Sequence, residues 1–170
     1  GGTFGFAEKT IAAPKAATFP NGCHVCEVEI DPETGVRQLQ TYIVVDDGGR
    51  VVNPMLVKGQ VHGGVVQGVG QILFEDIRYD EDGQLLTGSF MDYAMPRAHH
   101  MPSFQLEELG EFCKSNPIGV KGAGESGTVG APPAIIAAIV DALRDFDVTD
   151  IDMPATSSRV WQAMHPTVAS

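Results

Sequence analysis

The stretch NPIGVKGAGESGTVGAPP, from Asn116 to Pro133, constrains the fold more than any other part of the chain. It holds one cation, Lys121, and one carboxylate, Glu125, among five glycines: Gly119, Gly122, Gly124, Gly127 and Gly130. Glycine is used where the backbone needs a positive φ or must approach another group closely. So dense a cluster predicts a turn-rich loop or a ligand cradle. We interpret Glu125, which has few neighbouring side chains, as placed to meet something that approaches the backbone.

A helix is predicted directly after this loop, over residues 133–145. Its apolar residues recur at helical spacing: Ile135, Ile136, Ile139, Val140 and Leu143. Pro132 and Pro133 suit a first helical turn, where no N–H donor is needed. The loop would then end at a helix N-terminus, which favours anions through its free N–H groups and its dipole. The alternative is that Glu125 only complements that dipole or lies in water.

The glycine loop is similar to a phosphate-binding P-loop, but it lacks the residues that the motif requires. The P-loop reads G-x-x-x-x-G-K-[ST]. Here Gly122 and Gly127 have the right interval, but Thr128 and Val129 follow the second glycine. The lysine that would reach the phosphates is therefore absent at its position, and nucleotide hydrolysis is excluded as the function.

Composition and charge narrow the class of protein further. The chain has 170 residues, 43% of them hydrophobic, which is enough for one domain with a hydrophobic core. Its net charge of −11 is unfavourable for binding nucleic acid or anionic membranes. No run approaches the roughly 18 apolar residues of a transmembrane helix. No secretory signal is visible, so we expect a cytoplasmic protein. The first ten residues look like mid-chain sequence, however, so a signal could lie upstream of them.

The cysteines do not indicate a disulfide framework or a zinc site. Their number is odd, which argues against a complete set of disulfides. Cys23 and Cys26 form a single C-x-x-C pair, and the alternating sequence around them predicts a strand that sends the two side chains to opposite faces. We interpret all three cysteines as structural or incidental.

The first third of the chain is expected to be extended. Residues 1–21 show no periodicity and are interpreted as an extended arm or as the continuation of an upstream part. Residues 22–46 predict a β-hairpin, because two runs rich in β-branched and aromatic residues flank the turn sequence DPETG at residues 31–35.

Residues 51–77 predict a helix with an unusual number of glycines. Apolar residues recur at helical spacing, yet four glycines fall between Gly63 and Gly70. Each mid-helix glycine costs about 1 kcal/mol relative to alanine, so close approach of another backbone or of a ligand should offset the cost. Gln60 and Gln67 are seven residues apart, hence nearly on one face, where their amides could read the edge of a heterocycle. The alternative is an ordinary helix whose glycines pack on a sheet.

The remaining segments complete an α+β prediction. Residues 77–110 predict a second hairpin, with its turn at 79–83, and a strand near 104–109. Residues 148–151 predict a short strand, and residues 154–164 predict a final helix. Strands and helices mix without regular βαβ alternation, which favours an α+β fold of mixed strands in hairpins with two or three helices. Residues 22–165 would form one lobe of a domain, and residues 166–170 a tail.

Three motifs, in this order, resemble the molybdenum hydroxylases, the superfamily of xanthine dehydrogenase and aldehyde oxidase. They are NPM-x-V-x-GQVHGG-x-x-QG-x-GQ at Asn53 to Gln71, DYAMPRA at Asp92 to Ala98, and GVKGAGESG at Gly119 to Gly127. The resemblance is to the C-terminal part of the molybdopterin-binding large chain, above all that of aerobic carbon monoxide dehydrogenases and their relatives. It implies one lobe of a domain that binds molybdenum with molybdopterin cytosine dinucleotide, and partner subunits that carry FAD and two [2Fe–2S] clusters.

The resemblance also implies roles for individual residues. Glu125 corresponds to the family's catalytic glutamate beside molybdenum, and Gln60 to a glutamine that contacts the cofactor. Gln67, Lys121, Gly122 and Gly124 fall in the same two walls of the pterin site. No residue is expected to bind the metal directly. The implied reaction is hydroxylation or oxidation of a small carbon substrate (CO, an aldehyde or an N-heterocycle) with oxygen from water.

Two departures from the family pattern limit what the resemblance implies. The family's large chain is several times longer, so we interpret this chain as a fragment or split subunit that is inactive alone and needs the missing N-terminal part of the large subunit. The loop with the copper-binding cysteine of true CO dehydrogenases lies upstream of residue 1, so copper stays open, as does the choice among the substrates. The competing hypothesis is a non-catalytic structural or assembly module.

Overall fold

The computed structural model describes residues 5, 9–11, 13 and 16–166. Its sheet has three strands: β1 (Asn21–Ile30), β2 (Arg37–Asp47) and β3 (Phe104–Glu108), in the order β1-β2-β3. The β1–β2 pair is antiparallel and confirms the predicted hairpin, whereas β3 runs parallel to β2. A parallel neighbour needs a long crossover connection, and the helix and loops between residues 48 and 103 provide it.

The hairpin turn is fixed by local hydrogen bonds. The carboxylate of Asp31 accepts from the backbone N–H of Glu33 at 2.9 Å and from the hydroxyl of Thr34 at 2.7 Å. Gly35 closes the turn with φ +69°, a left-handed conformation that favours glycine. Any Cβ there would also collide with the backbone of Trp161 in the last helix.

Three α-helices follow: α1 (Pro54–Leu73), α2 (Ser126–Ala142) and α3 (Ser157–Met164). α1 begins as its sequence predicts, with Pro54 in the first turn and the Asn53 side chain accepting from the N–H of Leu56 at 3.2 Å. α3 begins with the equivalent cap, in which the Thr156 hydroxyl accepts from the N–H of Arg159. These helices confirm the predicted segments 51–77 and 154–164 within a few residues. Short 3₁₀ helices lie at Ala98–His100 and Arg144–Phe146.

The predicted start of the second helix is wrong by about seven residues. α2 begins at Ser126, so Pro132 and Pro133 lie inside it, and Gly127 and Gly130 belong to the helix and not to the loop. An interior proline costs roughly 3 kcal/mol because it removes a hydrogen bond and crowds the preceding turn. Burial of the first two turns of α2 against α1 offsets that cost.

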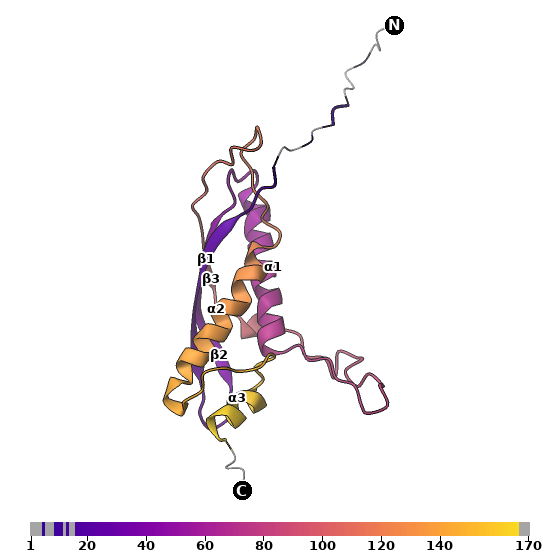
Figure 1. Cartoon of the computed structure of the whole chain (residues 1–170), viewed down its shortest axis with the longest axis vertical. Helices are drawn as coiled ribbons and strands as arrows, with labels where there is room; N and C mark the ends of the chain where they lie inside the picture. Colours follow the sequence, from indigo (N-terminus) through magenta and orange to yellow (C-terminus); the bar gives the residue numbers. More distant parts are fainter. Residues whose placement is uncertain (1–4, 6–8, 12, 14–15, 167–170) are drawn as a thin grey trace.

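Two predicted strands do not form among the described residues. The region expected as a second hairpin holds only an isolated bridge between Tyr79 and Leu85, and the loop from residue 74 to 97 extends away from the body of the molecule (Figure 1). Residues 148–151 also carry no strand. In contrast, β3 confirms the strand predicted near residues 104–109.

The helices α1 and α2 lie side by side on one face of the sheet and enclose the core between the two layers (Figure 1). The fully buried apolar residues come from β2, from all three helices and from the segments beside α2 and α3: Leu39, Tyr42, Val44, Val61, Val65, Val69, Ile72, Leu73, Ala131, Ile135, Ile139, Leu143, Ala155, Val160 and Met164. The α+β class predicted from the sequence is confirmed.

The expected arm and tail fall partly outside the described residues. Within the expected arm at 1–21, residues 1–4, 6–8, 12 and 14–15 lie outside the described residues. The described residues before Asn21 form no helix or strand, and Asn21 belongs to β1. Of the tail, residues 167–170 lie outside. In the part of the chain that the structure describes, no helix has the length and hydropathy needed to cross a membrane.

Candidate cofactor-binding site

α1 and α2 touch backbone to backbone through glycine. A Cβ on Gly64 would lie 2.8 Å from the backbone nitrogen of Thr128, and one on Gly68 would lie 2.7 Å from the Cβ of Ala131. Because both contacts advance along the two helices together, α1 and α2 run parallel and begin at the same end of the molecule (Figure 1). The first turns of α1 and the loop before α2 therefore share that end.

A second set of glycines faces open space. Nothing lies within 4 Å of a Cβ placed on Gly59 or Gly63 of α1. At 100° per residue, Gly59, Gly63, Gln67 and Gln60 follow one another around the helix, directly beside the strip that packs on α2. Both glutamines are exposed. The result is a strip of bare backbone and amide groups, which we call the glycine–amide strip (Gly59, Gln60, Gly63 and Gln67).

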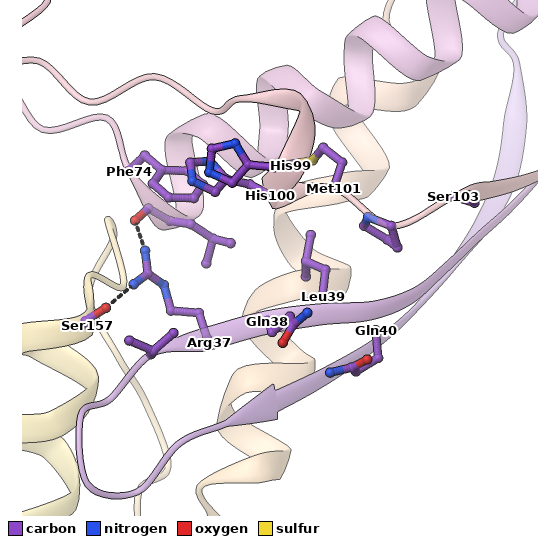
Figure 2. Close-up of a pocket in the computed structure, with 13 residues that line it drawn as sticks. Arg37, Gln38, Leu39, Gln40, Phe74, His99, His100, Met101, Ser103 and Ser157 are labelled. Carbon is purple, nitrogen blue, oxygen red and sulfur yellow. Dashed lines mark hydrogen bonds between the residues drawn. The ribbon is translucent and has the colours of Figure 1, made fainter.

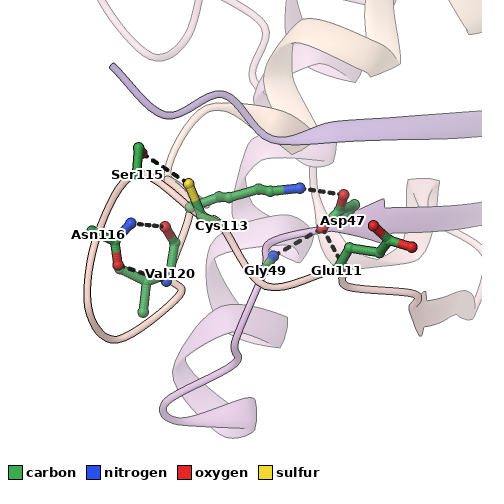
Figure 3. Close-up of polar contacts among 8 residues, drawn as sticks. Asp47, Gly49, Glu111, Cys113, Ser115, Asn116 and Val120 are labelled. Carbon is green, nitrogen blue, oxygen red and sulfur yellow. Dashed lines mark hydrogen bonds and ion pairs between the residues drawn. The ribbon is translucent and has the colours of Figure 1, made fainter. Parts of the chain in front are cut away.

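The loop before α2 is anchored to the end of β2. The ammonium of Lys121 forms an ion pair with the carboxylate of Asp47, which also accepts from the N–H groups of Gly49 at 3.0 Å and Glu111 at 3.2 Å (Figure 3). These bonds, the Lys121 side chain first, lower the pKa of Asp47. Lys121 is thus mostly occupied in holding the loop in place.

A second clamp shapes the same loop. The amide side chain of Asn116 binds both the carbonyl of Val120 at 2.8 Å and its N–H at 3.1 Å (Figure 3). After Lys121 the loop is free, and nothing lies within 4 Å of a Cβ placed on Gly122 or Gly124. Their backbone is open to a ligand in the way a cradle requires.

Glu125 stands at the N-cap position of α2, but its side chain makes no capping hydrogen bond and is exposed. It lines a cavity of about 320 Å³ together with residues of β1, β2 and α2 and the segment before β1: Phe19, Pro20, Asn21, Gly22, His24, Asp46, Ser126, Val129 and Gly130. Gln60 and Gln67 do not line this cavity. Gln60 lies in the first half of α1 and Gln67 in its second half, so the structure does not bring Glu125 and the two glutamines into one pocket.

Sequence reasoning missed two polar residues of this cavity, His24 and Asp46. Asp46 is buried, and Nε2 of His24 lies 3.8 Å from its Oδ1. The sequence holds one indirect signal for them in the glycines that face them. A Cβ on Gly22 would collide with the Asp46 carboxylate, and one on Gly130 would lie 2.5 Å from the His24 ring.

Another cavity, of about 530 Å³, lies between the start of β2 and the end of α1 (Figure 2). The guanidinium of Arg37 donates there to the carbonyl of Leu73 and to the hydroxyl of Ser157 at 2.5 Å. It thereby satisfies a carbonyl at the end of α1, where helices leave such groups unpaired. Phe74 and His100 stack beside it, and none of the residues predicted for the site lines this cavity.

The cysteines are free: Cys23 is exposed, whereas Cys26 is half-buried and packs against the core. Burial and the neighbouring Glu27 raise the pKa of the Cys26 thiol to about 12. Among residues 5, 9–11, 13 and 16–166, no three His, Cys, Asp or Glu side chains are grouped so as to hold a metal ion.

Comparisons with known proteins identify the family. Residues 2–102 match the family described as molybdopterin cofactor-binding domain. The chain is 38% identical over 151 residues to the carbon monoxide dehydrogenase large chain of Hydrogenophaga pseudoflava, covering 89% of this chain and 19% of the relative. It is 42% identical over 145 residues to the nicotine 6-hydroxylase large subunit of Paenarthrobacter nicotinovorans, covering 85% and 18%.

Solved structures give the same result. A crystal structure of a Cu,Mo-containing CO dehydrogenase matches with a TM-score of 0.81 at 37% identity, over 85% of this chain and 18% of that one. Quinoline 2-oxidoreductase from Pseudomonas putida 86 matches with a TM-score of 0.79 at 37% identity, over 82% and 18%. The chain spans about a fifth of the length of these relatives. It belongs to the molybdopterin cofactor-binding domain family, among the large chains of the molybdenum hydroxylases.

Proposed function

We propose that this chain contributes one wall of the cofactor site in a molybdenum-containing oxidoreductase, which hydroxylates or oxidises a small carbon substrate with oxygen derived from water. The observation that carries the proposal is the glycine–amide strip of α1, together with a free loop that lies beside the first turn of α1 and ends at the uncapped Glu125. Similar proteins are named for carbon monoxide, nicotine and quinoline, which supports a small carbon compound as substrate.

The residues present fit a molybdenum–pterin group. The two empty glycine positions on α1 and the two in the loop leave backbone that a bulky planar ligand can approach without clashes. Each glutamine amide offers two N–H donors and one acceptor oxygen, so Gln60 and Gln67 would bind the polar edge of the ligand. Backbone N–H groups at Gly122 and Gly124 would add donors. Lys121 would act mainly by holding this loop on Asp47.

Glu125 would serve as the general base. When bound, the molybdenum–pterin group supplies the two-electron oxidation of the substrate carbon. Glu125 would take the proton of the water molecule that supplies the oxygen atom, which requires its carboxylate to be within hydrogen-bond reach of that water. Its position fits the role, because the side chain is free of internal hydrogen bonds and faces a cavity that could hold water.

Partner subunits follow from the same comparison. Relatives are named as a large chain, a large subunit and a subunit of a dehydrogenase complex. We propose that the electrons leave through [2Fe–2S] clusters and FAD in partner subunits, and that the pterin is the cytosine dinucleotide form. Large apolar side chains exposed near the start of α1 and in the loop before α2 support a covering protein surface: Val52, Met55, Leu56, Phe112 and Ile118.

The test is Glu125→Gln in the native complex. The substitution keeps size and hydrogen bonding but removes the base, so turnover should fall roughly 10²–10⁴-fold while molybdenum and pterin content stay unchanged. Glu111→Gln is the matched control, because Glu111 is an exposed carboxylate whose backbone, not its side chain, contacts Asp47. A Glu125→Gln complex with full cofactor content and normal turnover would refute the assignment. A native complex without molybdenum would refute the proposed function and favour a structural module.

A further inference from the structure

His24 and Asp46 form a buried polar pair that the proposed function does not yet use. Their side chains are only 5% and 6% exposed, and Nε2 of His24 lies 3.8 Å from Oδ1 of Asp46. The other ring nitrogen, Nδ1, lies 2.8 Å from the hydroxyl of the fully buried Tyr42. Among the residues that the structure describes, neither carboxylate oxygen of Asp46 has a hydrogen-bond partner. A buried carboxylate that accepts no hydrogen bond is unfavourable for folding, which suggests that the pair has a function.

The backbone around the pair is shaped to admit it. Gly22 of β1 lies against the Asp46 carboxylate, and Gly130 of α2 lies against the His24 ring, where a Cβ would come within 2.5 Å of Nε2. Both glycines line the cavity that Glu125 also lines. One cavity of about 320 Å³ therefore contains a free carboxylate at its mouth and a histidine backed by a buried carboxylate in its wall.

Burial favours the neutral form of His24, and the carboxylates around it oppose that effect. Burial lowers the pKa of His24, although Asp46 opposes this. Glu108 of β3 lies opposite Asp46 in the sheet register. Burial and the neighbouring Asp46 and Asp47 raise the pKa of Glu108, and Lys58 of α1 acts in the opposite direction. Tyr42 faces the ring from β2, and burial keeps its hydroxyl protonated by raising its pKa. Glu125 is the titratable group that α2 adds to the cavity.

We infer that His24, backed by Asp46, receives the proton that Glu125 takes up in each turnover and so resets the base; this rests on the proposed function. The O–H bond of the protonated Glu125 breaks, and an N–H bond forms at Nε2 of His24, directly or through a water in the cavity. The Asp46 carboxylate balances the imidazolium charge. The step requires the tautomer in which Nδ1 donates to the Tyr42 oxygen, 2.8 Å away, because that tautomer leaves Nε2 free to accept the proton. The proton then passes to cavity water. His24 is thus a positioning residue that acts through Glu125.

The test uses the native complex with two substitutions of His24 and a control. His24→Gln should lower turnover about tenfold or more, as expected when a proton acceptor is lost, with unchanged molybdenum content. Wild-type turnover should fall as pH drops through the pKa of His24, below 6.5, because the protonated ring accepts no proton; His24→Gln should lack this decrease. His24→Ala, which leaves a gap in the cavity wall, should regain turnover when imidazole is added. His165→Gln, an exposed histidine at the end of α3, should behave as wild type.

A second measurement follows the proton itself. In single-turnover infrared difference spectra, the carbonyl band of protonated Glu125, identified by its loss in Glu125→Gln, should decay in wild type and persist in His24→Gln. Normal turnover and decay in His24→Gln, or lost turnover with an unchanged pH profile and no rescue by imidazole, would overturn the inference. If Glu125→Gln is inactive while His24→Gln is normal, the proposed function stands and only the inference fails. Full turnover of Glu125→Gln refutes both.

Discussion

Two neighbouring glycines of α1 give opposite expectations for the same substitution. Replacing a mid-helix glycine with alanine gains about 1 kcal/mol of helix propensity. At Gly63 the new methyl group meets nothing within 4 Å, so Gly63→Ala should stabilise the chain by about that amount. At Gly64 the methyl carbon would lie 2.8 Å from the backbone nitrogen of Thr128 and 3.1 Å from the α carbon of Gly127. Backbone atoms cannot rotate away, and such overpacking costs about 1–3 kcal/mol. The two variants should therefore differ by about 1–3 kcal/mol.

The assay is urea and thermal unfolding of the 170-residue chain, followed by far-UV circular dichroism. For a domain of this size, 1 kcal/mol corresponds to a shift in Tm of roughly 2–4 °C, so the predicted difference is measurable. Gly127→Ala tests the crossing from the other helix, since its Cβ would lie 2.6 Å from the carbonyl oxygen of Val61. Equal stability of Gly63→Ala and Gly64→Ala would show that α1 and α2 do not touch through their backbones.

Three further predictions concern the site and its supports. Gln60→Ala in the native complex should lower molybdenum content, whereas Gln105→Ala, an exposed glutamine on β3, should not; full metal content with lost turnover would contradict a binding role for Gln60. The ion pair with Lys121 lowers the pKa of Asp47 in the folded chain. The pair should therefore stabilise the folded chain above about pH 3.8, and this stabilisation should disappear as the pH falls through the lowered pKa of Asp47. Lys121→Met should lack this pH-dependent stabilisation, and identical acid unfolding curves of the variant and the wild type would argue against the pair. Arg37→Met removes both hydrogen bonds of the guanidinium and should destabilise the chain by about 1.5–3 kcal/mol in urea unfolding; an unchanged midpoint would mean that these bonds contribute nothing.

The elements that could be predicted from the sequence are those with strong local signals. The hairpin at β1 and β2 has alternating apolar residues and a DPETG turn, and α1 and α3 each begin with a capping side chain. The segments predicted wrongly lack such signals. Residues 77–90 carry strand-like sequence, but only the bridge between Tyr79 and Leu85 forms there, because no sheet edge lies beside this loop to pair with it (Figure 1).

The start of α2 was misjudged because the local rules favour the wrong boundary. Two prolines after a glycine cluster are typical of a helix beginning, not of its second turn. In the structure the first turns of α2 are buried on Gly64 and Gly68 of α1, which is a contact between segments about sixty residues apart. Tertiary packing therefore overrides a local preference, and nothing near Pro132 in the sequence reports it. Glu125, predicted from the sequence to lie in the loop well before the helix, stands at the N-cap position of α2 in the structure.

Glycine carries the functional information in this chain, but only after the structure divides it into classes. Gly64, Gly68 and Gly127 are needed so that two helices can touch, Gly22 and Gly130 leave room for Asp46 and His24, and Gly59, Gly63, Gly122 and Gly124 face nothing. A glycine whose neighbours fill its space is explained by the fold of this chain. Gly59 and Gly63 lower the helix propensity of α1 without such a contact, which supports the proposal that a ligand approaches the helix there. The second class lines the cavity of Glu125, and the helical members of the third class lie on the same face of α1 as the two glutamines. In the sequence Gly63 and Gly64 are indistinguishable, so the glycine–amide strip could be suspected from the motif but located only once the helix crossing was known.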